Sequence, residues 1–325
     1  MQDARRRLLI AGGALLAPSA LFAQAKVVRI GWLGPGSPSS AKRNIEPFRQ
    51  RLRELNYVEG RNVVIDAVWA EGDAAKLPGL AKELVRRKVD IIVAGGTSGA
   101  QAAQAATKVI PIVGASVGDL LEAGLVASLA RPGGNLTGTA VAFPERGSKQ
   151  LELIHEVMPL ARRVAVLWPG PRTTSFQRQR KELEANAPPR HELTWHTAQV
   201  KSDLGPVFEA IHVYKPEFLL VVTDAFYFNN RKELAGYAAK ARLPAVYAFR
   251  EFVEEGGLMS YGASISQSYR SAADYVDRIL KGVNPAELPV QMPAKLDLAV
   301  NITASRAVGL SFPQAVLARA DLIVH

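Results

Sequence analysis

Residues 90–103 read D-I-I-V-A-G-G-T-S-G-A-Q-A-A, and this stretch decides the fold. Asp90 to Ala94 is a short apolar run rich in β-branched residues, which is typical of a buried strand. Gly95-Gly96 interrupt the run, and Thr97 or Ser98 stands where a helix would begin, ahead of a series of small residues. The stretch therefore predicts a strand, a tight turn and a helix in direct succession.

The turn of this unit is a candidate ligand site. It places backbone N–H groups, the hydroxyls of Thr97 and Ser98 and the positive end of a helix dipole at the carboxyl end of a strand, where open α/β sheets bind ligands. A carboxylate fits such a place. The alternative is an ordinary connection in which one hydroxyl only caps the helix, as in most such turns. On this stretch alone, both interpretations stay open.

The first 25 residues are expected to be a targeting segment. Arg5-Arg6-Arg7 form a charged region, Leu8 to Phe22 is apolar, and Ala23-Gln24-Ala25 matches a signal-peptidase site. The apolar run is shorter than the roughly 20 residues that span a bilayer, and no second candidate span follows, so the mature protein is predicted not to span a membrane. We expect cleavage after Ala25 and a periplasmic protein. Either the twin-arginine or the general secretory route fits the sequence.

Composition narrows the classes of function further. The chain has 325 residues, no cysteine and a formal charge of +10, which becomes +8 when the three arginines and one aspartate of residues 1–25 are removed. The absence of cysteine excludes disulfides, thiolate metal sites, a cysteine nucleophile and a lipid-modified cysteine. Lys and Arg are scattered over predicted helix faces, without a basic block or interleaved aromatics, so no nucleic-acid partner is expected.

Strands and helices alternate on both sides of the opening stretch. The first half contains expected strands at Val27–Leu33, Asn62–Trp69, Asp90–Ala94, Ile110–Ser116 and Leu136–Ala142, and one of the helices between them is expected at Leu121–Ala130. The second half repeats the alternation, with strands at Arg163–Trp168, Glu192–Thr197, Phe218–Thr223 and Ala245–Phe249. This predicts an α/β fold of two doubly wound, Rossmann-like lobes with parallel sheets and one cleft between them.

Several longer stretches resemble a known family. They are L-N-Y-V-E-G-R-N (55–62), W-A-E-G (69–72), G-L-V-A-S-L-A-R-P-G-G-N-L-T-G (124–138), R-E-F-V-E-E-G-G-L-M-S-Y-G (250–262), Y-V-D-R-I-L-K-G (275–282) and L-A-R-A-D (317–321). With them the chain resembles the substrate-binding proteins of ABC transporters that have the type 1 periplasmic binding-protein fold, in particular the group assigned to tryptophan or tyrosine transport. The stretches run along nearly the whole mature chain.

The resemblance implies three crossings between the lobes, near Phe143-Pro144, near Phe249-Arg250 and within 285–293. The amino-terminal lobe would then comprise 26–143 and 250–284, and the carboxy-terminal lobe 144–249 and 285–325. Two positions depart from the family pattern. Asp119 is followed by Leu120 where the family has Asp-Pro, which leaves open whether Asp119 faces the cleft, and Trp168-Pro169 replaces Asn-Pro.

The ends of the strands supply the candidate ligand-binding residues, because the fold encloses its ligand with the loops of both lobes. They are Leu33, Gly34, Thr97, Ser98, Ala115, Ser116 and Phe143 from the first lobe, Trp168, Asp224, Phe226 and Tyr247 from the second, and Tyr261 from the returning strand. We expect hydroxyls of the first lobe (Thr97, Ser98, Ser116) to hold a carboxylate, Asp224 to pair with an ammonium, and Trp168, Phe226 and Tyr247 to form flat walls. The alternatives are that Asp224 caps a helix and that Trp168 and Tyr247 are core or rim residues.

Catalysis is not expected. The histidines show no metal-ligand spacing, and neither a G-x-S-x-G elbow nor a G-x-G-x-x-G loop occurs, so no catalytic residue, metal or cofactor is predicted. The predicted function is therefore binding of a small solute, such as an aromatic or other apolar amino acid, by hinge closure, with delivery to an ABC permease in the inner membrane. The alternative is a periplasmic ligand sensor that acts on a receptor or regulator, which needs the same closure.

Overall fold

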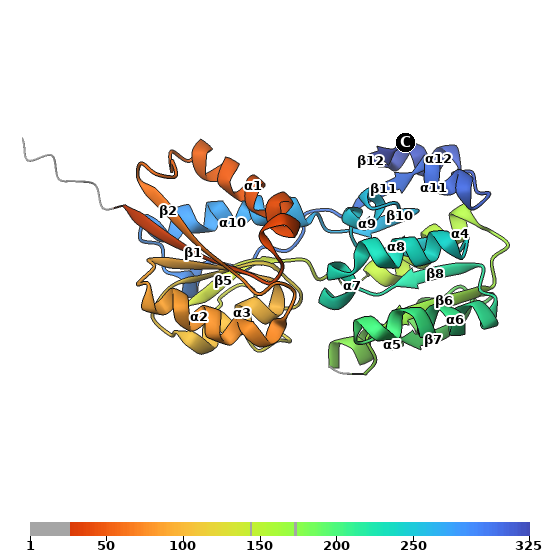
Figure 1. Ribbon diagram of the computed structural model, residues 1–325, viewed down its shortest axis with the longest axis horizontal. Helices are drawn as coiled ribbons and strands as arrows, with labels where there is room; N and C mark the ends of the chain where they lie inside the picture. The colour runs from red at the N-terminus through yellow and green to blue at the C-terminus, as the bar shows by residue number, and fades with distance from the viewer. Residues whose placement is uncertain (1–26, 144, 172–173) are drawn as a thin grey trace, which may run out of the picture.

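The computed structural model describes residues 27–143, 145–171 and 174–325, which form two lobes side by side (Figure 1). The expected targeting segment, residues 1–25, lies outside the described residues. Within the described part, no helix combines the length and the apolar character needed to cross a bilayer.

The first lobe is built on a parallel five-stranded sheet in the order β2-β1-β3-β4-β5. Its strands are β1 (Val28–Gly34), β2 (Val63–Trp69), β3 (Ile91–Gly95), β4 (Ile112–Val117) and β5 (Leu136–Ala140). Its helices are α1 (Pro38–Glu54), α2 (Leu77–Arg86), α3 (Gly96–Ala106) and, from much later in the chain, α10 (Ile265–Leu280), with short 3₁₀ turns at Ala74–Lys76 and Pro285–Glu287. The predicted strand and helix of residues 90–103 are confirmed as β3 and α3, but α3 follows β3 without an intervening residue and begins at Gly96, ahead of Thr97 and Ser98.

Side-chain alternation along β3 explains why helices cover both faces of this sheet. Ile91 and Val93 point into one core with Phe48 of α1 and with α10, whereas Ile92 and Ala94 point into a second core with α2 and α3. A strand that is buried on both faces must be apolar throughout, which is the pattern from which it was predicted.

The second lobe is built on a seven-stranded sheet in the order β12-β11-β10-β9-β8-β6-β7, parallel except for the pair β10 and β11. Its strands are β6 (Arg163–Trp168), β7 (Glu192–Thr197), β8 (Phe218–Val221), β9 (Ala245–Tyr247), β10 (Met259–Gly262), β11 (Asp297–Asn301) and β12 (Leu322–Val324). Its helices are α4 (Arg146–Val157), α5 (Thr174–Asn186), α6 (Leu204–Tyr214), α7 (Ala225–Asn229), α8 (Arg231–Lys240), α9 (Arg250–Glu254), α11 (Ile302–Ala307) and α12 (Gln314–Arg319), with a 3₁₀ turn at Lys201–Asp203.

The lobe boundaries differ from those expected for 250–284. Helix α9 and strand β10 belong to the second lobe, because Met259 and Ser260 pair with Val246 and Tyr247 of β9 and because β10 also pairs with β11. The chain therefore returns to the first lobe only after β10, which ends at Gly262, and before α10, which begins at Ile265. In Figure 1, α10 is the blue helix that lies among the red and orange elements.

The last crossing also lies later than the lobe assignment implied. Residues 285–291 lie along β5 of the first lobe, where Thr137 donates to the carbonyl of Leu288 and Gln291 exchanges backbone hydrogen bonds with Gly138 and Ala140. The crossing therefore follows Gln291 and ends where β11 begins at Asp297. Of the first expected crossing, Phe143-Pro144, the proline lies outside the described residues.

The expected helix at Leu121–Ala130 is wrong, because these residues form successive turns. Gly124 has a left-handed backbone (φ +67°), and the N–H of Leu125 returns to the carbonyl of Leu120, which ends the first turn after a few residues. The N–H of Ala127 bonds to the carbonyl of Pro132 instead of a residue one turn back. The apolar residues in 121–130 have the spacing of a helix, but the left-handed backbone of Gly124 interrupts the helix.

Candidate functional site

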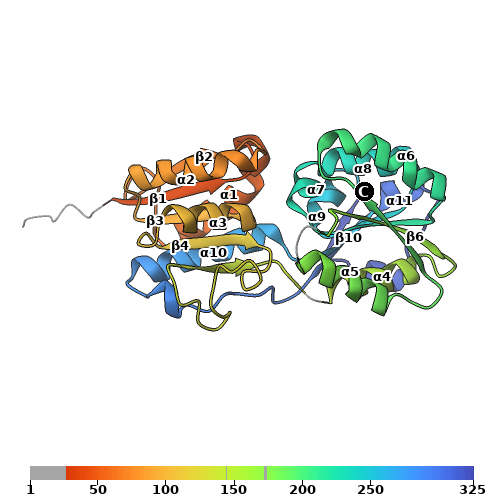
Figure 2. The same ribbon diagram turned by 90° about the horizontal axis from the view of Figure 1, so that it is seen from below.

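The carboxyl ends of the strands of the first lobe face the second lobe. Figure 2 shows α3 of the first lobe and α7 of the second on the facing ends of the two lobes. Each of these helices follows a strand directly, α3 after β3 and α7 shortly after β8. We call the parts of the two lobes around the starts of α3 and α7 the first wall and the second wall, and only some of the predicted strand-end residues lie on them.

The first wall contains the amino-terminal end of α3. Gly95 at its N-cap has no side chain, so no side-chain cap covers the first backbone N–H groups of this helix. Ser98 is exposed, and Thr97 is half-buried and accepts a hydrogen bond from the N–H of Gly118 at 3.1 Å. Backbone N–H groups without a side-chain cap and a positive dipole end suit a carboxylate.

Ser116 lies on the same wall in a strained conformation. Its φ is +57°, which is left-handed and unusual for serine, and the pairing of β4 with β5 shifts register between Gly114 and Val117. Its N–H donates to Thr139 Oγ1 at 3.2 Å and to Ser268 Oγ at 3.0 Å. The side chain is half-buried at the strand end.

Three other predicted residues of the first lobe have no side chain that is accessible to a ligand. Leu33 and Ala115 are fully buried core residues, and the carbonyl of Gly34 accepts the N–H of Ala70 at 2.9 Å. Phe143, next to the first crossing, is half-buried. The strand-end rule located this wall, but it did not separate residues that face outward from residues that face the core.

The sequence analysis missed an aromatic cluster behind the first wall. Trp32 stacks on Tyr269 with ring centroids 5.3 Å apart and also contacts Trp69 and Phe48. The hydroxyl of Tyr269 lies 2.6 Å from the point that a Cβ at residue 95 would occupy, so the glycine there makes room for it. Burial raises the pKa of the Tyr269 hydroxyl, which therefore stays protonated and able to donate. Nothing in the sequence around Tyr269 shows that α10 returns to this edge of the first lobe, so the candidate residues did not include it.

The second wall is formed around α7. Asp224 caps this helix and accepts the N–H of Phe226 at 2.7 Å, so the alternative that it is a capping residue is confirmed. Its carboxylate is half-buried, as is the ring of Phe226. Asp224 also lines a crevice that is too narrow for a water molecule, together with Val221, Val222, Thr223, Tyr227, Ala248, Phe249 and Phe252.

Trp168 and Tyr247 lie in the core of the second lobe. Trp168 is 5 % exposed and packs against Trp195, and Tyr247 is completely buried and stacks on Phe252 with centroids 4.5 Å apart. Burial raises the pKa of the Tyr247 hydroxyl, which has no hydrogen-bond partner within the described part of the chain. In this arrangement neither ring is available as a flat wall, because a strand end can point its side chain into the sheet's own core.

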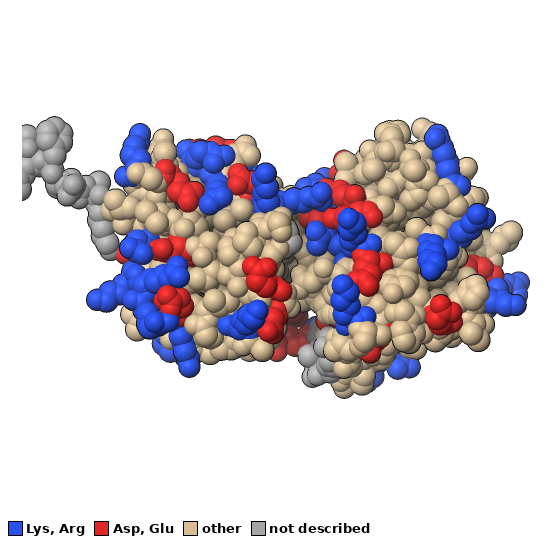
Figure 3. Space-filling view, viewed as in Figure 1, with Lys and Arg blue, Asp and Glu red and all other residues tan. Residues whose placement is uncertain are grey.

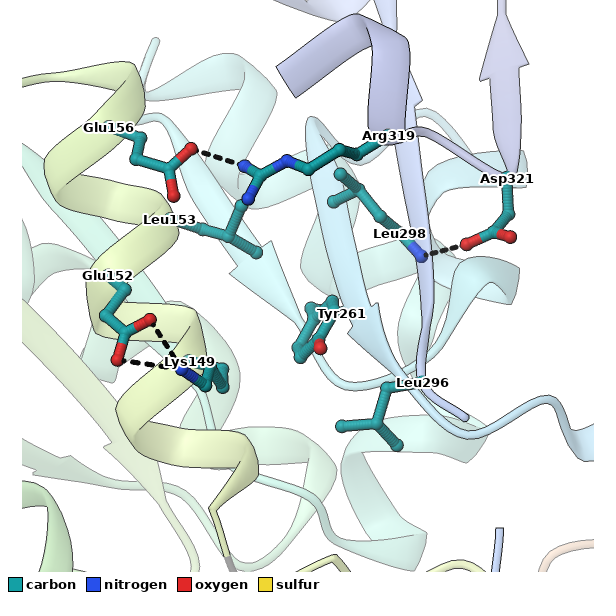
Figure 4. Close-up of a pocket in the computed structure, with 9 residues that line it drawn as sticks. All are labelled: Lys149, Glu152, Leu153, Glu156, Tyr261, Leu296, Leu298, Arg319 and Asp321. Atoms are coloured by element: carbon teal, nitrogen blue, oxygen red, sulfur yellow. Dashed lines mark hydrogen bonds and ion pairs between the residues drawn. The ribbon is translucent and has the colours of Figure 1, made fainter. Parts of the chain in front are cut away.

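Tyr261 lines a separate hollow of about 220 Å³ between α4, β10, β11 and α12 (Figure 4). The charged groups around this hollow already have partners. Lys149 pairs with Glu152, Arg319 pairs with Glu156, and Asp321 accepts the N–H of Leu298. The hollow therefore leaves little unmatched charge for a ligand, and Tyr261 does not join the group around Asp224. Among the described residues, no cluster of His, Asp or Glu has the composition of a metal site.

Ion pairs connect the two lobes. Arg178 of α5 reaches Glu122 at 2.8 Å and Asp119 at 3.3 Å in the first lobe, so Asp119 does face the other lobe. Arg43 of α1 pairs with Glu254 of α9. Figure 3 shows Lys and Arg next to Asp and Glu where the lobes meet. These contacts stabilise the arrangement of the lobes seen here.

Comparisons with known proteins agree on one family. The profile of the family described as ABC transporter substrate binding protein matches residues 37–324. A tyrosine-binding protein of Clostridioides difficile (strain R20291) is 27 % identical over 254 residues, which are 78 % of this chain and 73 % of the relative.

Two solved structures of relatives differ in whether a ligand is bound. An ABC domain from Streptococcus pneumonia in complex with L-Trp is 25 % identical, with a TM-score of 0.82 over 91 % of this chain and 99 % of that one. A ligand-free, open substrate-binding protein with adhesive properties from Clostridium difficile is also 25 % identical, but its TM-score is 0.70 over 92 % and 99 %. At nearly equal identity and coverage, the whole-chain TM-score is therefore higher with the tryptophan complex than with the ligand-free structure.

Fold and sequence thus lead to the same assignment. An ABC transporter solute-binding protein from Agrobacterium vitis, which is 15 % identical, matches 87 % of this chain with a TM-score of 0.59, a likeness that shows the fold alone. The family profile covers nearly all of the described chain. The chain belongs to the ABC transporter substrate-binding protein family and has the type 1 periplasmic binding-protein fold.

Proposed function

We propose that the protein is exported to the periplasm, binds an aromatic amino acid between its lobes and delivers it to a membrane permease without catalysing a reaction. One observation supports an amino acid as the ligand: the start of α3, which has no side-chain cap, lies on one lobe, and the carboxylate of Asp224 lies on the other. An amino acid has a carboxylate and an ammonium to match them. Tryptophan in one relative and tyrosine in another support an aromatic side chain.

The aromatic part of the ligand would lie against rings beside the two walls. Phe226 borders the second wall, and Trp69, which is half-buried, belongs to the cluster behind the first. Thr97, Ser98 and Ser116 would receive the carboxylate. Closure of the lobes on the ligand would follow from its higher affinity for the closed state.

A thermal-shift experiment tests this proposal. Residues 26–325 are unfolded and refolded to remove any carried-over ligand, then heated with and without tryptophan, tyrosine and other amino acids. At roughly ten times its dissociation constant, a ligand adds about 1.4 kcal/mol, which raises the midpoint by about 3 °C. A shift with tryptophan or tyrosine supports the proposal. If another class of metabolite gives a shift and no amino acid does, the amino-acid assignment is wrong.

The contacts of Arg178 predict a salt-sensitive affinity. Arg178→Gln removes two ion pairs between the lobes but none within a lobe, and we expect about two- to fivefold weaker binding at low salt. At 0.5 M salt the wild-type affinity is expected to fall to that of the variant, because salt screens exposed ion pairs. Lys149→Gln, which removes a pair inside α4, is the matched control. Equal affinity of wild type and Arg178→Gln at low salt would contradict the prediction.

A further inference from the structure

Ser116 is held in its left-handed conformation by two hydroxyls from other elements. Thr139 on β5 and Ser268 on α10 are 2 % and 7 % exposed, and both accept the N–H of Ser116. Their oxygens lie 2.6 Å apart, and Thr139 Oγ1 also lies 3.3 Å from the carbonyl of Ser268. One proton arrangement satisfies every group: Thr139 donates to that carbonyl, and Ser268 donates to Thr139.

The conformation would be unfavourable without these contacts. A serine at positive φ is disfavoured by its Cβ, and an N–H group buried without an acceptor is costly. The register shift between Gly114 and Val117 removes the ordinary ladder partner, so the two hydroxyls replace it. Strained residues of this kind are found where the surrounding structure holds them for a purpose.

The position of Ser268 adds a link to the lobe crossing. It lies in the first turn of α10, which begins directly after the chain enters the first lobe, and the same part of the helix carries Tyr269 to the turn at Gly95. A single helix thus fixes the backbone at residue 116 and places the ring next to the start of α3. Both are parts of the first wall.

We propose that Ser268 and Thr139 are positioning residues that hold Ser116 left-handed and thereby aim its hydroxyl at the carboxylate of the bound solute. The second half of this inference rests on the proposed function, whereas the first half concerns the backbone alone. Neither residue has to touch the ligand. Their effect on affinity passes through the conformation of Ser116.

A double-mutant cycle on the mature protein tests both halves. Ser268→Ala is expected to weaken tryptophan binding about fivefold in the wild-type background. In a Ser116→Gly background the same change is expected to cost less than about twofold, because glycine adopts positive φ without a Cβ penalty. Ser271→Ala is the matched control, since Ser271 lies on the same helix, is 6 % exposed and does not bond to Ser116. It should leave affinity unchanged in both backgrounds.

Thermal midpoints of the same four proteins provide a readout without ligand. Ser268→Ala should lower the midpoint clearly less in the Ser116→Gly background than in the wild type. Equal losses in both backgrounds, in affinity or in midpoint, would overturn the positioning role. If the wild type binds no amino acid, the proposed function and the aiming of the hydroxyl both fail, and the midpoints still decide whether Ser268 holds Ser116.

Discussion

Gly138→Ala is expected to destabilise the first lobe by more than about 3 kcal/mol. Gly138 has a φ of +141°, and a Cβ there would lie 2.0 Å from the carbonyl oxygen and 2.7 Å from the nitrogen of Gly114. Both atoms belong to the backbone of the adjacent strand β4, so the sheet itself would have to separate. The measurement is the free energy of unfolding from denaturant titration of the mature protein.

Gly134→Ala is the control for this change. Gly134 lies in the loop that leads into β5, and nothing lies within 4 Å of the point that its Cβ would occupy. We expect its free energy of unfolding to stay within about 0.5 kcal/mol of the wild-type value. A loss of less than about 1 kcal/mol in Gly138→Ala would show that β4 and β5 do not approach as closely as described.

Asp224→Asn is expected to weaken the binding of tryptophan about 30- to 100-fold, or about 2 to 2.7 kcal/mol. The substitution removes the negative charge proposed to pair with the ammonium. It keeps a side-chain oxygen for the N–H of Phe226, and asparagine caps helices as well as aspartate does. The fold of α7 should therefore persist, and titration calorimetry measures the loss of affinity directly.

The control for this second change is Asp203→Asn. Asp203 also lies in the second lobe, where it accepts the N–H groups of Gln199 and Val200, which lower the pKa of its carboxyl. Its loss of charge should leave affinity unchanged. If Asp224→Asn binds tryptophan as the wild type does while Asp224→Ala lowers the thermal midpoint, Asp224 is only a cap and the ammonium anchor is wrong.

The local sequence was sufficient to predict elements that are buried in the same way along their whole length. The run from Asp90 to Ala94 is apolar on both faces because helices cover both, and Gly95-Gly96 end it wherever the strand is placed, so β3 and α3 were predictable. The two parallel-sheet lobes were predictable because they depend on the order of elements, not on single contacts. The family, predicted from sequence stretches along the chain, is confirmed by the profile that matches residues 37–324. Thr97, Ser98, Ser116 and Asp224 remain predicted ligand residues.

The features that could not be predicted depend on contacts with residues far away in the sequence. The lobe to which β10 belongs depends on its pairing with β9 and β11, which no local pattern encodes. Tyr247 occupies a strand end like the predicted contact residues, yet its ring turns into the core because Phe252 of α9 stacks on it. Tyr269 reaches the candidate site only through the return of α10, so its role was invisible in its own sequence neighbourhood.

The late return of the chain to the first lobe also constrains when that lobe can be completed during synthesis. Thr137 bonds to Leu288, 151 residues further along, and Ser116 bonds to Ser268 at a separation of 152. A nascent chain that has emerged only to β5 still lacks α10 and the segment along that strand. The first lobe therefore acquires its last contacts after most of the second has been translated, and such distant pairings slow folding because a long loop must close first.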